Sequence, residues 1–235
     1  MAEAIGAKTQ RAFMDKLGLL DRLEIEIPET SRPLSPRSWH RTTTVTVSYG
    51  HGISISPAHL ASAVAAASGN GQWIQPTLLK RQTGDSPLRL RVFSEQTARA
   101  VRSMMRLVIS HEDGTGNFAE ARGYMIGGKT GTAEKQVNGT YKRNALISSF
   151  VGVFPSTDPR FVVYVMIDEP KGIRESFGYA TGGWTAAPVV GAVIQRMAPL
   201  FGIAPLDESA PEVVRALTVN ASAGPDVRTR PNATN

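Results

Sequence analysis

The sequence predicts an α+β fold in which helices flank an antiparallel sheet. The chain has 235 residues, of which 41% are hydrophobic, and this is enough for one domain with a sizeable core. Three strand-like segments follow one another with turn signals between them. Segments with helix-start signals precede these strands, and a helical segment follows them. Consecutive strands joined by short turns favour an antiparallel meander, so the helices are expected to cover its faces.

The N-terminal part is predicted to be helical at first and irregular afterwards. Residues 2–17 have the pattern of an amphipathic helix that ends at Gly18, with Ile5, Ala12, Phe13 and Leu17 toward one side. Residues 19–43 are rich in Pro and Arg, so we expect mostly loop there.

Two further helices are predicted to begin at serine caps. Ser56 is followed by a proline in the first helical position and opens a helix to about Ser68. Ser94 caps the second helix, whose apolar stripe consists of Ala98, Val101, Met104, Met105 and Val108. A polar, Gly-containing loop at 111–121 then leads to the first strand.

The predicted sheet begins with the strand that carries Lys129. Asn138-Gly139 is a strong hairpin signal after this strand, and the apolar segment 145–154 follows it. The turn-forming segment 155–159 separates that strand from the third one, at 161–167. A last helix over 185–200 is rich in Ala and Val, which suits packing on a sheet.

The end of the chain has a different composition. From about Gly202 onward, Pro, Ala, Ser, Asn and Thr dominate. We therefore expect one domain over residues 1–200 and a disordered tail over residues 201–235.

The segment 127–132, Gly-Gly-Lys-Thr-Gly-Thr, permits two incompatible chemistries. Counted from Gly123, it has the spacing of a phosphate-binding loop. Such a loop requires a strand that ends before its first glycine and a helix that starts at the Lys-Thr pair. Here bulky residues follow Gly123, and Gly131 is a poor residue for a first helical turn. The context therefore argues against a nucleotide-binding site.

The other chemistry is a substrate-binding wall on a strand. Lys-Thr-Gly triplets occur beside the nucleophile in serine acyl-transferases of the penicillin-binding kind. The glycines of the segment are expected to leave one face of the strand bare, so that a peptide can add to it by main-chain hydrogen bonds. We expect Lys129, Thr130, Gly131 and Thr132 to bind substrate, with the ammonium and the two hydroxyls directed at a carboxylate. A plain edge strand, with lysine as a guard against aggregation, is the structural alternative.

Further segments, in this order and spacing, resemble the transpeptidase domain of class B penicillin-binding proteins, most closely the septal (cell-division, penicillin-binding protein 3 type) branch. The resemblance covers about residues 1–200, in the segments 49–57, 70–71, 75–79, 123–133, 148–152, 168–171, 178–183 and 186–189. It implies a β-lactamase/transpeptidase-like fold, whose sheet in the family has five strands. This chain is expected to supply the three sequential ones.

The chain departs from the family pattern at the nucleophile. Members carry Ser-x-x-Lys, then Ser-x-Asn, then Lys-Thr-Gly. No serine in this sequence has a lysine three residues later. Ser68-Gly69-Asn70 matches Ser-x-Asn, but it ends a predicted helix, where Gly and Asn are common caps. We therefore expect an N-terminally truncated domain, with both motifs upstream and no catalytic nucleophile in these residues.

The resemblance implies a D,D-transpeptidase that cross-links peptidoglycan stem peptides in septal cell-wall synthesis and is acylated by β-lactams. The implied partners are stem peptides, β-lactams and, for the full-length family protein, membrane proteins of the divisome, with no cofactor and no metal. Because acyl transfer needs an activated nucleophile, this chain alone is expected to be inactive. A non-catalytic module that binds peptidoglycan peptides is the alternative function.

The composition of the chain argues against several kinds of site and partner. The chain has no cysteine, which excludes disulfides and thiolate metal sites, and its four histidines lack ligand-like spacing. The net charge of +6 comes without a basic patch interleaved with aromatics, so nucleic acid is not an expected partner. No segment approaches the roughly 18–20 apolar residues of a membrane span, and the N-terminus lacks a signal-peptide pattern. For the full-length protein the family resemblance implies the periplasmic face of the inner membrane.

Two pairs of polar residues look catalytic at first sight. Ser148 and Ser149 lie in a predicted strand without a base in a compatible position, so packing roles are expected. Asp168 and Glu169 are adjacent at the end of a strand, and strand alternation predicts that they point to opposite faces and share no site.

Overall fold

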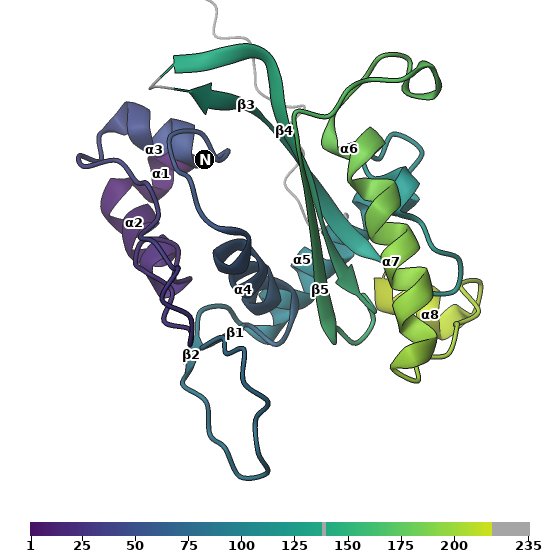
Figure 1. Cartoon of the computed structure of the whole chain (residues 1–235). Helices are drawn as coiled ribbons and strands as arrows, with labels where there is room; N and C mark the ends of the chain where they lie inside the picture. Colours follow the sequence, from purple (N-terminus) through teal and green to yellow (C-terminus); the bar gives the residue numbers. More distant parts are fainter. Residues whose placement is uncertain (138–139, 218–235) are drawn as a thin grey trace, which may run out of the picture.

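The computed structural model describes residues 1–137 and 140–217, and Figure 1 shows their arrangement. The N-terminal helices are α1 (Ala2–Ile5), α2 (Ala7–Lys16), α3 (Arg41–Val47) and α4 (Pro57–Ser68). A small ribbon of β1 (Gln72–Ile74) and β2 (Arg89–Arg91) follows, then α5 (Glu95–Ser110) and the 3₁₀ turn η1 (Asn117–Ala119). The main sheet consists of β3 (Gly127–Val137), β4 (Thr140–Phe154) and β5 (Phe161–Asp168). The remaining elements are η2 (Arg174–Ser176), α6 (Gly182–Thr185), α7 (Ala187–Leu200) and α8 (Pro211–Leu217).

The main sheet is the predicted antiparallel meander. Its strand order is β3-β4-β5, with Lys129 opposite Val151 and Val151 opposite Tyr164. The turn predicted at Asn138-Gly139 lies outside the described residues, and the strands on its two sides pair up to Val137 and Thr140. Within the described residues β3 and β5 are the two edges of this sheet, so β3 presents one unpaired backbone edge.

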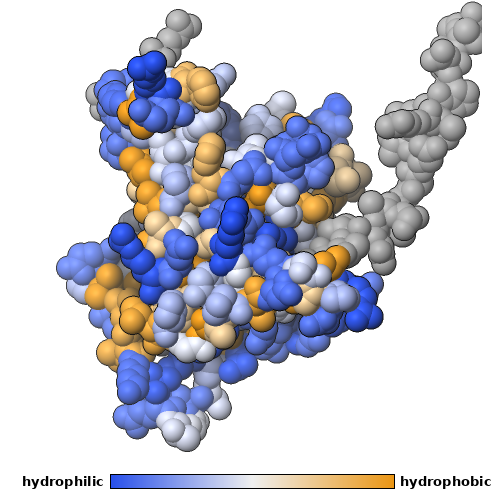
Figure 2. Space-filling model, turned by 90° about the vertical axis from the view of Figure 1, so that its right-hand side faces the viewer, coloured by the Kyte–Doolittle hydropathy of each residue, from blue (hydrophilic) through white to orange (hydrophobic). Residues whose placement is uncertain are grey.

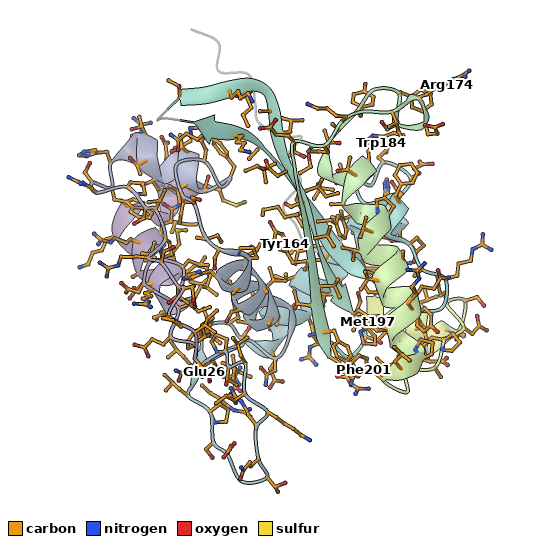
Figure 3. The ribbon with its side chains drawn as sticks, viewed as in Figure 1. Glu26, Tyr164, Arg174, Trp184, Met197 and Phe201 are labelled. Atoms are coloured by element: carbon orange, nitrogen blue, oxygen red, sulfur yellow. The ribbon has the colours of Figure 1, made fainter. Side chains whose placement is uncertain are left out.

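Helices cover both faces of the sheet, as the α+β prediction requires (Figure 1). α6 and α7 lie on one face, and α4 and α5 lie on the other. The main core lies between the sheet and α7, where Phe150, Phe154 and Ile194 are fully buried. Gly152 allows this close packing, since a Cβ atom there would lie 2.7 Å from Cγ1 of Val190. In Figure 3 Met197 and Phe201 lie at α7, whereas Tyr164 lies on the side of β5 that faces α4.

The serine caps are confirmed, but the first helix differs from its prediction. The hydroxyl of Ser56 accepts a hydrogen bond from the backbone N–H of His59, and that of Ser94 accepts one from Thr97. The segment 2–17 forms two helices, because Gly6 has a φ of +79° and breaks the helical backbone between them. α3 begins inside the segment that was predicted to be mostly loop.

The first part of the predicted tail, residues 201–217, contacts the domain. The backbone N–H of Leu206 donates to the carbonyl of Gly123 at 2.8 Å, and Val213 of α8 packs on Met125. Glu208 also reaches the buried guanidinium of Arg106. These long-range contacts hold the segment to residue 217 on the domain despite its loop-like composition. The rest of the predicted tail, residues 218–235, lies outside the described residues.

The outer surface is mixed in character. Figure 2 shows the side of the molecule that carries α6 and α7, where hydrophobic surface is dispersed among hydrophilic residues. Val189, Val193 and Leu200 are exposed apolar residues of α7. No helix within residues 1–137 and 140–217 has both the length and the apolar character that a membrane crossing requires.

Candidate substrate-binding strand

Lys129 and Thr130 lie inside a strand and not in a loop that opens a helix. Lys129 pairs with Val151 and Thr130 with Phe150, and β3 continues to Val137. A phosphate-binding loop needs a helix N-terminus directly after the Lys-Thr pair. The structure therefore excludes the nucleotide-binding alternative for this segment.

The glycines of the segment do not share one bare face, contrary to the prediction. A Cβ atom on Gly127 would lie 3.2 Å from Cβ of Met105 in α5, whereas one on Gly128 would lie 2.4 Å from the ring of Phe150 on the other face. Adjacent strand residues point in opposite directions, so the two glycines make room for different layers of the core. By the same alternation Lys129 belongs to the α5 side of the sheet, and Thr130 to the α7 side.

The ammonium of Lys129 nevertheless meets the Thr130 hydroxyl at the unpaired edge of β3. Lys129 Nζ donates to the Thr130 carbonyl at 2.9 Å and lies 3.3 Å from Thr130 Oγ1. Lys129 is exposed, and no carboxylate among the described residues forms an ion pair with it. An exposed, unpaired cation beside a hydroxyl can hold an anionic group such as a carboxylate.

Thr115 joins this edge and was not predicted from the sequence. Its Oγ1 lies 3.1 Å from Oγ1 of Thr130, and its side chain is exposed. The residue lies in the polar loop before β3, which the sequence analysis described only as a connection. The position of this loop in the sequence, shortly before the Lys-Thr-Gly strand, was the one signal that could have pointed to Thr115. Three polar groups, from Thr115, Lys129 and Thr130, therefore gather at one edge.

Thr132 and Gly131 contact the start of α6 and help to hold it on the sheet. Thr132 Oγ1 accepts a hydrogen bond from the backbone N–H of Gly182 at 3.1 Å, and the Thr132 hydroxyl proton stays available to a ligand. A Cβ atom on Gly182 would lie 2.1 Å from the Ser149 carbonyl oxygen and 2.7 Å from that of Gly131. Only glycine fits at this contact between α6 and the two strands.

A buried arginine supports the start of β3. Arg106 of α5 is almost fully buried, and its Nη1 donates to the Ile126 carbonyl at 3.0 Å. The same guanidinium forms an ion pair with Glu120 at 2.8 Å and lies 3.7 Å from Glu208. One side chain thus links α5, the loop before β3 and the C-terminal segment directly behind the predicted binding strand.

The pairs that looked catalytic have structural roles. Ser148 is buried, and its hydroxyl donates to the Ala180 carbonyl at 2.5 Å, which fixes the loop before α6. Asp168 and Glu169 do meet, contrary to the prediction, since Lys135 Nζ lies 2.6 Å from Asp168 Oδ2 and 3.2 Å from Glu169 Oε1. Glu169 lies just past β5 with a φ of +49°, so strand alternation no longer applies to it.

The ionic contacts around Lys135 shift the pKa values of two side chains, Lys135 and Glu169. The hydrogen bond that Lys135 donates to Asp168 is the largest reason that the pKa of Lys135 is raised above its ordinary value. Lys135 in turn is the largest reason that the pKa of Glu169 is lowered. Both shifts favour the charged forms.

A separate cavity of about 920 Å³ lies between α4, α5 and the β4–β5 turn. Arg99, Arg102 and Arg160 line it, and none of the four predicted site residues does. Burial lowers the pKa of Arg102, whose guanidinium donates to the carbonyls of Ser68 and Gly69 at the end of α4. In the part of the chain that the structure describes, no three His, Asp or Glu side chains are arranged to hold a metal ion.

An antiparallel sheet between helical layers, with Lys-Thr-Gly on its edge strand, is typical of serine acyl-transferases of the penicillin-binding kind. Comparison with known families agrees with this class. Residues 1–195 match the penicillin-binding protein transpeptidase domain, and the chain belongs to this family. The predicted family and fold are thereby confirmed.

Individual relatives include a probable peptidoglycan D,D-transpeptidase and a sporulation protein. It is 40% identical over 210 residues to the probable peptidoglycan D,D-transpeptidase FtsI of Caulobacter vibrioides, covering 86% of this chain and 36% of that protein. It is 38% identical over 170 residues to stage V sporulation protein D of Bacillus subtilis, covering 68% and 25% respectively. The chain therefore spans 36% and 25% of the length of these two relatives.

A solved structure shows the same fold. The transpeptidase domain of Burkholderia pseudomallei penicillin-binding protein 3 superposes with a TM-score of 0.78 at 33% sequence identity. The superposition covers 89% of this chain and 61% of that one.

Proposed function

We propose that this chain forms the substrate-binding wall of a peptidoglycan D,D-transpeptidase that cross-links stem peptides in septal cell-wall synthesis. Lys129, Thr130, Gly131 and Thr132 bind the donor peptide along β3, and Thr115 completes the edge. β-Lactams, which imitate the donor peptide, are ligands of the same wall. Stem peptides and the divisome are the partners, and the site of action is the periplasmic face of the inner membrane.

The observation that carries the proposal is the unpaired ammonium at an open strand edge. Lys129 Nζ forms hydrogen bonds only with its neighbour Thr130 among the described residues, and β3 pairs only with β4 there. A peptide that pairs with the free edge of β3 brings its terminal carboxylate to Lys129, with the Thr115 and Thr130 hydroxyls as further donors. Backbone pairing supplies affinity, and the charge fixes the register of the peptide.

In the proposed reaction this wall binds and orients but does not attack. The nucleophilic serine oxygen forms an ester with the carbonyl carbon of the donor, and the terminal D-residue leaves as an amine. An acceptor amine then displaces the serine and completes the cross-link. Lys129 holds the terminal carboxylate and so positions the carbonyl. No Ser-x-x-Lys occurs in the 235 residues, so the attacking group has to come from another polypeptide segment.

Binding by this wall is tested with two peptides that end in two D-alanines, one with a free carboxylate and one with a carboxamide. The carboxylate peptide is expected to bind at least tenfold tighter, because a hydrogen bond to a charged group contributes roughly 1.5–3 kcal/mol. Lys129→Met should abolish this difference. Lys135→Met is the matched control, since Lys135 lies on the same strand but is paired with Asp168 and Glu169. Equal binding of both peptides to the unaltered chain would refute the proposed wall.

The missing nucleophile motif favours a second candidate, a binding module without catalysis. Fluorescent penicillin separates the two functions. We expect no covalently labelled band after denaturation of the chain alone, and a labelled band when a segment with Ser-x-x-Lys is supplied in the same polypeptide. Carboxylate-dependent peptide binding without labelling in the joined polypeptide would favour the binding module.

A further inference from the structure

The cavity between α4, α5 and the β4–β5 turn has a positively charged lining, and we call it the arginine cavity. Its four arginines come from the β1–β2 loop, from α5 and from the turn, and they are Arg81, Arg99, Arg102 and Arg160. Glu95 and Asp158 are the acidic residues of the lining. The cavity therefore has four cationic side chains against two anionic ones.

Among the described residues, these arginines have no carboxylate close enough to compensate their charge. Within residues 1–137 and 140–217, no salt bridge includes any of the four. Arg81 Nη2 donates to the Gln75 carbonyl at 2.6 Å. Arg102 Nη1 donates to the carbonyls of Ser68 and Gly69 at 2.8 and 2.7 Å. These bonds hold the two side chains in place and occupy one nitrogen of each, so their other N–H groups can donate to a ligand.

Two of the arginines repel each other. Arg99 and Arg102 are three positions apart on α5, so their side chains leave the same side of the helix. Burial is the largest reason that the pKa of Arg102 is lowered, and the like charge of Arg99 is the next one, while Asp158 acts in the opposite direction. The charged form of Arg102 is thus disfavoured where it lies. An anion between the two guanidinium groups would offset this repulsion.

The α4 side of the cavity is lined by small side chains. Ala58, Ala61, Ser62 and Ala65 have the spacing of one helix face and lie along the cavity. α4 contacts both α5 and β1, which supply neighbouring parts of the lining (Figure 1). Because only small side chains of α4 line the space, a volume of about 920 Å³ stays open. Small-molecule sites typically have roughly 300–1,000 Å³.

We propose that the arginine cavity is a binding site for a diphosphate group. Guanidinium groups match phosphate oxygens in pairs of parallel hydrogen bonds, and a diphosphate offers oxygens to arginines from several segments at once. A single carboxylate engages one such fork and is therefore the weaker ligand here. The alanines of α4 give space to the group that carries the diphosphate. The site is independent of the proposed peptide site, because no residue of the segment 129–132 lines the cavity.

The test is calorimetric titration of the full chain with inorganic pyrophosphate at fixed ionic strength. We expect a single saturable site, and at least tenfold weaker binding of orthophosphate, which reaches fewer guanidinium groups. Arg99→Gln and Arg160→Gln should each lower the affinity for pyrophosphate about tenfold, because each removes hydrogen bonds to a charged group. Asp158→Asn should raise the affinity, since one carboxylate no longer repels the ligand. Arg196→Gln is the matched control, because it removes the same charge from an exposed position on α7 outside the cavity.

Geranyl diphosphate distinguishes two sources of the diphosphate group. Binding that is tighter than that of pyrophosphate supports a lipid-linked ligand, whose apolar part contacts the alanines of α4. Equal binding of the two compounds supports a soluble diphosphate.

Three results would overturn the site. The first is the lack of saturable pyrophosphate binding by the unaltered chain. The second is an equal loss of affinity in Arg196→Gln and in the two cavity variants, since binding would then depend only on net charge. The third is loss of the site when a segment with Ser-x-x-Lys is joined to the chain, because that segment would then fill the cavity. Arg99 is exposed, so Arg99→Gln should keep the melting temperature of the unaltered chain, which separates lost binding from lost folding.

Discussion

The hydroxyl oxygens of Thr115 and Thr130 lie 3.1 Å apart, so the loop before β3 is bonded to the strand that carries Lys129. One hydroxyl can donate to the other and the second can donate to a ligand. This contact is the reason that Thr115 belongs to the proposed binding edge.

Thr115→Val is expected to weaken binding of the carboxylate peptide about three- to tenfold. Valine keeps the shape of threonine but removes one donor near the carboxylate, and a net hydrogen bond contributes about 0.5–1.5 kcal/mol. Titration by calorimetry measures the change. Thr83→Val in the β1–β2 loop is the control, and an affinity unchanged in Thr115→Val would remove Thr115 from the site.

Arg106→Leu is expected to destabilise the domain by about 3 kcal/mol. The substitution leaves Glu120 and Glu208 without their shared cation and the Ile126 carbonyl without its donor. Urea unfolding followed by circular dichroism gives the free energy of unfolding. Arg99→Leu removes an exposed arginine from the same helix and should cost less than about 0.5 kcal/mol. Equal costs for the two variants would contradict the support role of Arg106.

The ionic contacts of Lys135 should stabilise the sheet over a defined pH window. The lowered pKa of Glu169 gives a contribution that is present above its unfolded value of 4.5 and is lost as pH falls through the folded value. The raised pKa of Lys135 gives one that is present below 10.5 and is lost as pH rises through the folded value. The difference in melting temperature between the unaltered chain and Lys135→Met should therefore be largest between these limits and shrink beyond each. A difference independent of pH would show that charge is not its cause.

Gly182→Ala is expected to cost about 1–3 kcal/mol, because the new methyl group meets the carbonyl oxygens of Ser149 and Gly131 at overlapping distances. Gly84→Ala serves as the comparison. At Gly84 the φ of +102° is unfavourable for any residue with a side chain, but no atom lies within 4 Å of the position that a Cβ atom would take. Its cost should be about 1 kcal/mol, close to backbone strain alone. If Gly182→Ala unfolds at the same urea concentration as the unaltered chain, α6 does not rest on the strands as described.

Much of the fold follows from signals that act over a few residues. Ser56 and Ser94 cap their helices as predicted, and the apolar runs 145–154 and 161–167 lie in β4 and β5. These outcomes depend on capping bonds and on apolar runs bounded by turn residues, which are features of a local segment. Gly6 shows where such local signals fail. A glycine inside a helical pattern can either break the helix or be tolerated, and the neighbouring residues did not indicate that Gly6 breaks it.

The sequence by itself therefore determined the family, the strand that carries Lys129 and the order of the helices around it. Only the tertiary structure decided which groups meet there. Thr132 bonds to Gly182 across 50 positions, and Gly123 bonds to Glu208 across 85. Glu169 reaches Lys135 because its backbone has a positive φ, which the sequence does not predict. Such contacts depend on how whole layers pack, since the partners come from segments that approach each other only after the sheet and its helices have assembled.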